Sequence, residues 1–122
     1  MKILIADDSL HFRIIMKKKL SEIKEIEEIH EADNYVNTID QLEKEEPDFL
    51  ILDIRLPDES GIHVLDYLQD QEKKPVVMVA SDYALENNRS QAMEKGADFV
   101  FDKAKDKDKI IKTIKEYQKT SG

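Results

Sequence analysis

The chain has 122 residues, 40% of them hydrophobic, which is enough for one domain with a single core. Its 19 Lys and Arg against 27 Asp and Glu give a formal charge of −8 at pH 7, which argues against binding to nucleic acid or anionic lipid. The lack of cysteine excludes disulfides, thiolate catalysis and cysteine-based zinc sites. No apolar stretch is as long as a membrane span, and we expect a soluble protein of the cytoplasm.

Five short apolar runs predict β-strands. Four of them are continuous, as expected for strands that are covered on both faces of a parallel sheet. The remaining run mixes glutamate with isoleucine and is typical of an edge strand. In chain order the runs are 3–6, 26–32 (the mixed run), 49–52, 76–80 and 99–101.

The segments between these runs predict helices, because apolar residues recur in them at steps of three and four. Such repeats occupy 12–23, 36–42, 62–68 and 110–117, and a less amphipathic helix is expected at 83–95. Pro47 should stop the second helix, Ser60 should begin the third, and Gly96 should close the fourth. Strand and helix thus alternate five times.

This alternation with short connections predicts an α/β fold in which a parallel sheet lies between two layers of helices. We find no linker, repeat or low-complexity segment. The sequence therefore predicts one domain over residues 1–122, without a separate effector domain.

Ligands of such sheets bind beyond the carboxyl ends of the strands, so the residues that follow each apolar run are candidates for function. These residues are Asp7 and Asp8, Asp53, Ser81 and Lys103. Three carboxylates at one edge repel one another unless a cation lies among them. Magnesium fits, because it prefers hard oxygen ligands and keeps waters that a phosphoryl oxygen can replace.

The chemistry that follows is phosphoryl transfer. Asp53 is the candidate nucleophile, which would form an acyl phosphate, while Lys103 and the Ser81 hydroxyl would bind phosphoryl oxygens. The simpler interpretation, that each aspartate caps a helix or ends a loop, is plausible for Asp8 or Ser9 alone. It does not account for the whole set.

The residues resemble the receiver domain of two-component response regulators over nearly the whole chain. The matching motifs are the acidic first strand from Ile3 to Asp8, the segment from Asp53 to Gly61 that includes Pro57, the pair Ala80-Ser81, and Gly96-Ala97-Asp98 leading to Lys103. Each motif alone is weak, but the spaced set is specific.

The resemblance implies a flavodoxin-like fold with five helices and strand order 2-1-3-4-5. It also implies that a histidine kinase or histidine phosphotransfer protein phosphorylates Asp53, and that the chain catalyses only its own phosphorylation and dephosphorylation. Magnesium would be bound by Asp8, Asp53 and the main-chain carbonyl of Arg55, with Asp7 acting through water. Ser81 and Lys103 match the switch hydroxyl and the phosphate-binding lysine.

The resemblance further implies that the signal leaves through a protein partner, which would bind the face of the fourth helix, fifth strand and fifth helix. The domain would be a monomer or a phosphorylation-linked dimer. Arg55 and Tyr83 match positions that flank the phosphoryl group, and we hypothesise that this bulky pair slows dephosphorylation.

Two positions depart from the family pattern. The family usually has an aromatic switch residue where this chain has Val100, with Phe99 and Phe101 as neighbours that we expect to be core residues. It usually has a proline, preceded by a cis bond, where this chain has Ala104; a cis bond to alanine would cost about 3 kcal/mol. These departures keep open a receiver-like scaffold that binds its partner without phosphorylation.

Two further protein classes fit the sequence less well. A flavin-binding protein of the same layered fold would need glycines and hydroxyls after the first strand, where Asp7 and Asp8 would repel a phosphate. An aspartyl phosphatase typically has a second acid two residues after the nucleophile, where this chain has Arg55.

Overall fold

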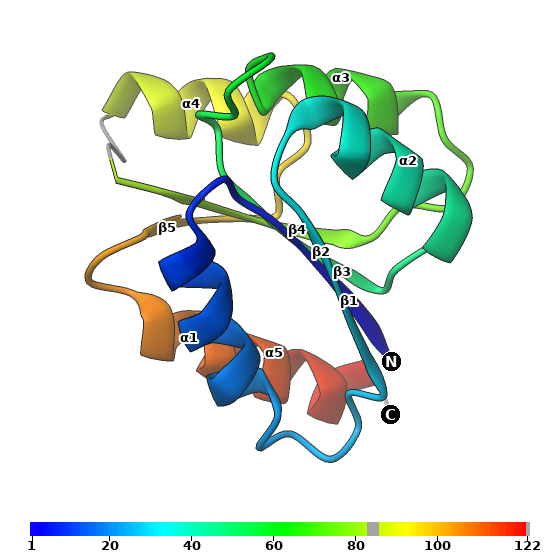
Figure 1. Cartoon of the computed structure of the whole chain (residues 1–122), viewed down its shortest axis with the longest axis vertical. Helices are drawn as coiled ribbons and strands as arrows, with labels where there is room; N and C mark the ends of the chain where they lie inside the picture. Colours follow the sequence, from blue (N-terminus) through cyan, green and yellow to red (C-terminus); the bar gives the residue numbers. More distant parts are fainter. Residues whose placement is uncertain (83–85, 122) are drawn as a thin grey trace.

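The structure of the chain is a computed structural model (Figure 1) that describes residues 1–82 and 86–121, with 86–88 and 118–121 described by their backbone alone. Within the described residues, strands and helices alternate along the chain. They are β1 (Lys2–Ala6), α1 (Leu10–Leu20), β2 (Glu28–Ala32), α2 (Tyr35–Glu45), β3 (Phe49–Leu52), α3 (Ile62–Gln69), β4 (Val76–Ser81), α4 (Glu86–Glu94), β5 (Phe99–Asp102) and α5 (Lys107–Ser121).

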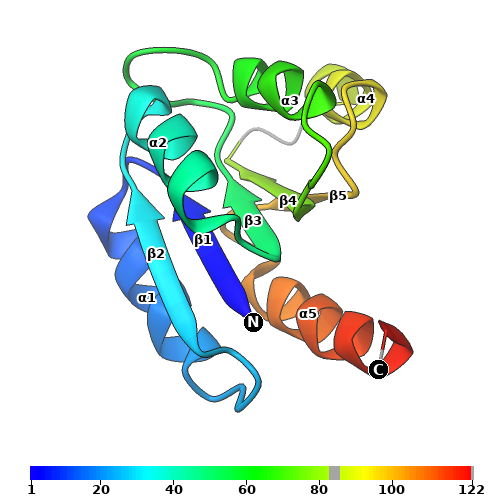
Figure 2. The same ribbon diagram turned by 90° about the vertical axis from the view of Figure 1, so that its right-hand side faces the viewer.

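The strands form one parallel sheet in the order β2-β1-β3-β4-β5 (Figure 2), which confirms the order implied by the resemblance. β2, the strand with mixed polar and apolar residues, lies at the edge, as the sequence predicts. The three central strands are almost entirely buried, which explains their continuous apolar runs.

Helices α2, α3 and α4 cover one face of the sheet, and α1 and α5 cover the other (Figure 1). Alternate residues of each strand enter two separate cores. Leu4 and Leu50 pack beneath the first layer, whereas Ile3 and Ile51 pack beneath the second, with Met16 of α1. The chain therefore has the flavodoxin-like three-layer fold.

Short polar contacts set the ends of the helices. The Ser9 hydroxyl caps α1 by accepting a hydrogen bond from the backbone N–H of Phe12 at 3.2 Å. The pattern predicts α1 up to residue 23, but the helix ends at Leu20, and Ile23 is buried from a turn instead. α3 begins at Ile62, where the repeat begins, but its N-cap is Gly61 and not Ser60, whose hydroxyl accepts a hydrogen bond from Ile62 N at 3.2 Å.

The structure describes both positions that depart from the family pattern, Val100 and Ala104. The described residues contain no cis peptide bond, so the bond between Lys103 and Ala104 is trans. Val100 is buried in the core beneath α2, α3 and α4. Phe99 and Phe101, which we expect to be core residues, are only partly buried; they pack against the opposite core with their rings stacked 6.0 Å apart.

None of the helices in the described part of the chain is long and apolar enough to span a membrane. Tyr83, for which the sequence suggests a position beside the phosphoryl group, lies outside the described residues.

Candidate functional site

The strand order brings the predicted site residues together. β1, β3, β4 and β5 are successive neighbours in the sheet, and all are parallel, so their carboxyl ends lie at one edge. Asp7 and Asp8 follow β1, Asp53 follows β3, Ser81 ends β4 and Lys103 follows β5. Residues far apart in the sequence thus meet because of the sheet topology.

The three aspartates form a compact cluster. One carboxylate oxygen from each of Asp7, Asp8 and Asp53 lies within 4.8 Å of the others. Asp7 and Asp53 are buried, with 1% and 5% of their surface exposed, whereas Asp8 is exposed. The cluster therefore has two carboxylates held inside the protein and one that faces solvent.

Lys103 supplies a positive charge to the two buried carboxylates. Its Nζ lies 2.8 Å from both carboxylate oxygens of Asp7 and donates a hydrogen bond to Oδ1. It also donates to Asp53 Oδ2 at 3.3 Å. The Lys103 ammonium lies over the ring of Phe12, 5.0 Å from its centroid, which is a favourable cation–π arrangement.

This environment changes the protonation equilibria of the site. Burial raises the pKa of Asp53 to about 6; the charge of Asp7 adds to this shift, and Arg55 N–H and Lys103 oppose it. Burial also raises the pKa of Asp7, against the hydrogen bond from Lys103. Burial opposes a charged Lys103, but the contacts with Asp7 and Asp53 together raise its pKa.

The main chain fixes the orientation of the buried carboxylates. Asp53 Oδ1 accepts a hydrogen bond from the backbone N–H of Arg55 at 3.0 Å, and Asp7 Oδ1 accepts one from Ser9 N at 2.8 Å. Gly61 lies against this loop, where a Cβ atom would collide with the carbonyl oxygen of Asp53 and would lie 2.8 Å from the Cα of Ile54. Gly61 is therefore needed for close backbone approach.

The site opens into a cavity of about 490 Å³, and its lining includes Asp8, Asp53, Arg55, Ser81 and Lys103. Ser81 is buried, with 2% of its surface exposed, and its carbonyl oxygen accepts a hydrogen bond from Lys103 N at 3.0 Å. The candidate nucleophile, hydroxyl and amine thus border one space.

The donor set fits magnesium. Its side-chain oxygens are all carboxylates, which are hard ligands. Asp7 Oδ2 is buried, and although Lys103 Nζ lies 2.8 Å away, it accepts no hydrogen bond from the described residues. The single positive charge of Lys103 does not balance three carboxylates, and a divalent cation would offset the remaining negative charge.

The sequence pattern places Phe12 only on the apolar face of α1, and it does not mark His11 or Lys107 as site residues. The structure puts all three on the wall of the cavity. Lys107 Nζ lies 5.9 Å from the Phe12 ring centroid, on the same ring as Lys103. No spacing in the sequence identifies this contact, since α1 and α5 meet only through the fold.

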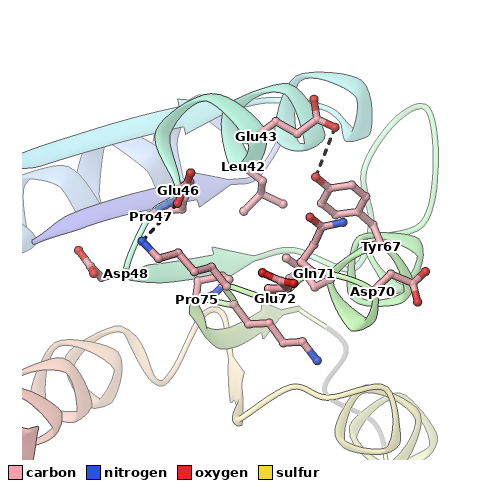
Figure 3. Close-up of a pocket in the computed structure, with 13 residues that line it drawn as sticks. Leu42, Glu43, Glu46, Pro47, Asp48, Tyr67, Asp70, Gln71, Glu72 and Pro75 are labelled. Atoms are coloured by element: carbon pink, nitrogen blue, oxygen red, sulfur yellow. Dashed lines mark hydrogen bonds and ion pairs between the residues drawn. The ribbon is translucent and has the colours of Figure 1, made fainter.

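A second cavity, of about 680 Å³, lies near the amino ends of the strands, between the C-terminal parts of α2 and α3 (Figure 3). Two pairs of its polar groups are in contact: Tyr67 Oη donates to Glu43 Oε1 at 3.3 Å, and Lys73 Nζ lies 3.5 Å from Glu46 Oε2. The predicted phosphoryl-transfer residues lie at the other end of the sheet.

The family follows from comparison with known proteins. The family model for the response regulator receiver domain matches residues 3–115. The chain belongs to this family. Receiver domains of response regulators are phosphorylated on aspartate, and they are not a family of enzymes.

Curated relatives agree with this assignment. The sensory transduction protein LytT of Bacillus anthracis is 33% identical over 98% of this chain and 48% of its own length. The sporulation initiation phosphotransferase F of Bacillus subtilis is 30% identical over 95% of this chain and 92% of its own length. The receiver domain thus spans about half the length of the LytT relatives.

Solved structures show the same fold. A CheY-like receiver domain protein from Methanospirillum hungatei has a TM-score of 0.86 at 24% identity and covers 99% of this chain and 98% of its own. The receiver domain of a DNA-binding response regulator from Colwellia psychrerythraea has a TM-score of 0.89 at 22% identity, with 98% of both chains covered.

Proposed function

We propose that this receiver domain accepts a phosphoryl group on Asp53 from the phosphohistidine of a histidine kinase or histidine phosphotransfer protein. The observation that carries the proposal is the position of Asp53, which borders an open cavity between a buried carboxylate and a buried ammonium group. The similarity to a curated phosphotransferase over 95% of this chain supports a place in a phosphorelay.

In this reaction a carboxylate oxygen of Asp53 attacks phosphorus, and the P–N bond of phosphohistidine breaks with its electron pair going to the imidazole. Lys103 Nζ, 3.3 Å from Asp53 Oδ2, then donates to a phosphoryl oxygen. The Ser81 hydroxyl donates to another phosphoryl oxygen and reports its presence by moving toward it. The hydrogen bond from Arg55 N keeps the Asp53 carboxyl oriented throughout.

Magnesium would be held by Asp7, Asp8, Asp53 and the main-chain carbonyl of Arg55. When bound, it neutralises charge on the carboxylates and on the transferring phosphoryl group. The exposed side chain of Arg55 lines the cavity, and with Tyr83 it is proposed to slow attack by water on the acyl phosphate. A phosphoprotein lifetime that does not change in an Arg55→Ala, Tyr83→Ala variant would contradict that role.

The proposal treats residues 1–122 as one receiver domain in the cytoplasm that passes its signal to a protein partner. The face of α4, β5 and α5 is the proposed output surface, and the domain acts as a monomer or a phosphorylation-linked dimer. A partner that binds with the same affinity regardless of phosphorylation and of substitutions on that face would contradict it.

Intact-mass analysis after treatment with acetyl phosphate tests the proposal directly. We expect one phosphate adduct that requires magnesium and is absent in Asp53→Asn. Asp70→Asn, an exposed residue at the C-terminal end of α3, is the matched control and should be modified like the parent. No adduct in the parent, with magnesium and a competent phosphohistidine donor, would favour the phosphorylation-independent scaffold instead.

A further inference from the structure

We propose a second metal site, in which Glu28, His30 and Glu45 bind one divalent transition-metal ion of the zinc class. The site is independent of the phosphorylation chemistry. Glu28 is the first residue of β2, His30 is the middle one, and Glu45 is the last residue of α2. The site therefore lies toward the amino ends of the strands, at the opposite end of the sheet from Asp53.

The fold places these three side chains on one face. Glu28 and His30 are alternate residues of the edge strand, so they point to the same side of the sheet. They pair in register with Lys2 and Leu4 of β1, and Leu4 belongs to the core beneath α2. α2 crosses this face beside β2 (Figure 2) and brings Glu45 to it.

The distances match a metal centre. His30 Nε2 lies 3.3 Å from Glu28 Oε1 and 3.4 Å from Glu45 Oε2. Ligands bound about 2.0–2.2 Å from a tetrahedral zinc ion are separated by about 3.3–3.6 Å along each edge of the tetrahedron. The two carboxylate oxygens lie within 4.8 Å of each other, and rotation of the exposed Glu28 side chain can shorten that edge.

The surroundings of His30 Nε2 are a second observation. Its Nε2 atom is shielded from solvent and makes no hydrogen bond with the described residues, although two carboxylates face it. Nε2 and the two carboxylate oxygens thus face one another at 3.3 and 3.4 Å with no hydrogen bond between them. A metal ion satisfies the nitrogen and both carboxylates at once.

The ligand set selects the class of metal. One imidazole nitrogen and two carboxylates favour zinc and its neighbours in the transition series, whereas magnesium prefers oxygen ligands alone. The acidic cluster at Asp53 contains oxygen ligands only, so the two sites have different preferences.

Lys2 is the competitor for this site. Its Nζ lies 3.7 Å from Glu28 Oε2 and 3.6 Å from Glu45 Oε2, and it partly offsets their charge. The Lys2 ammonium also donates a hydrogen bond to the main-chain carbonyl oxygen of Glu45 at 3.4 Å. This bond holds the lysine beside the three proposed ligands and not among them. Removal of this ammonium group should therefore tighten metal binding, whereas a simple ion-pair cluster would only lose stability.

Titration of the full chain with ZnCl₂ by calorimetry, with magnesium present at saturating concentration, tests the proposal. We expect one zinc ion per chain in the parent, at least tenfold weaker binding in His30→Gln and in Glu45→Gln, and several-fold tighter binding in Lys2→Gln. His63→Gln is the matched control, because His63 also lies beside a glutamate, Glu59, but on the exposed surface of α3. Asp53→Asn should bind zinc like the parent.

NMR of the imidazole nitrogens provides a readout in the folded parent, where zinc should shift the Nε2 resonance of His30 and leave that of His63 unchanged. Zinc binding that survives His30→Gln and Glu45→Gln would overturn the proposal. Binding that disappears in Asp53→Asn would also overturn it, since zinc would then occupy the acidic cluster. So would the absence of saturable binding in the parent.

Discussion

The ammonium group of Lys103 lies 2.8 Å from the carboxylate of Asp7, although the two residues are 96 positions apart in the sequence. Lys103 is farther from Asp53, at 3.3 Å. One lysine therefore serves two buried carboxylates and compensates Asp7 more closely. Asp53 keeps a destabilised charge, and it is the group that would react.

Lys103→Met should destabilise the metal-free domain, because it leaves two buried carboxylates without a counter-charge. We expect the free energy of unfolding to fall by about 2–4 kcal/mol in EDTA at pH 7, and magnesium to restore much of the loss. Urea unfolding, first in EDTA and then with magnesium, measures the loss of stability and its recovery. Lys109→Met is the control, since that exposed lysine has only a surface ion pair with Asp106, which should be worth at most about 1 kcal/mol. An equal loss in both variants would contradict the assigned role of Lys103.

The raised pKa of Asp53 predicts a specific dependence of stability on pH. Because the folded-state pKa is about 6 and the ordinary value for aspartate is 3.8, the native state binds more protons than the unfolded state between these values. The free energy of unfolding of the metal-free domain should therefore fall as pH rises from about 4 to about 6. Asp7, whose pKa is also raised, contributes with the same sign.

Asp53→Asn removes the Asp53 part of that dependence and should be more stable than the parent at pH 7 in EDTA, by about 1–3 kcal/mol. Asp58 provides a control, because its carboxylate should make stability depend on pH in the opposite direction. Its pKa is lowered by hydrogen bonds from Tyr35 N and Val36 N, so Asp58→Asn should lose stability at neutral pH and approach the parent under acid. A parent that gains stability steadily from pH 4 to 7 would contradict the Asp53 assignment.

The sequence predicts the strands and the edge of the sheet that holds the site, because both depend on local patterns. Continuous apolar runs reflect burial on two faces, and the carboxyl ends of parallel strands always meet at one edge. Alternation alone does not define the strand order, which followed from the resemblance to the family. Contacts between distant side chains, such as Phe12 with Lys103 or Glu45 with His30, have no local signature.

Gly61→Ala should damage the site through the backbone. A Cβ atom there meets the main chain of Asp53 and Ile54, which cannot rotate away as a flexible side chain can. We expect a loss of about 1–3 kcal/mol in stability and slower phosphorylation by acetyl phosphate. Gly96→Ala is the matched control: Gly96 has a φ of 104° but open space around its Cα, so it should lose stability through strain and keep the phosphorylation rate. Unimpaired phosphorylation in Gly61→Ala would contradict this role.

Phe12→Leu tests whether the aromatic ring stabilises the charged lysine. Leucine keeps an apolar side chain in the core but removes the ring that lies 5.0 Å from Lys103 Nζ. A double-mutant cycle with Lys103→Met should give a coupling free energy of about 0.5–2 kcal/mol, measured by urea unfolding in EDTA. The same cycle with Phe49→Leu should give none, because Phe49 is equally buried but contacts Tyr117 edge to face. Additive effects in the Phe12 cycle would reduce this residue to a core side chain, and the charge of Lys103 would then depend on Asp7 and Asp53 alone.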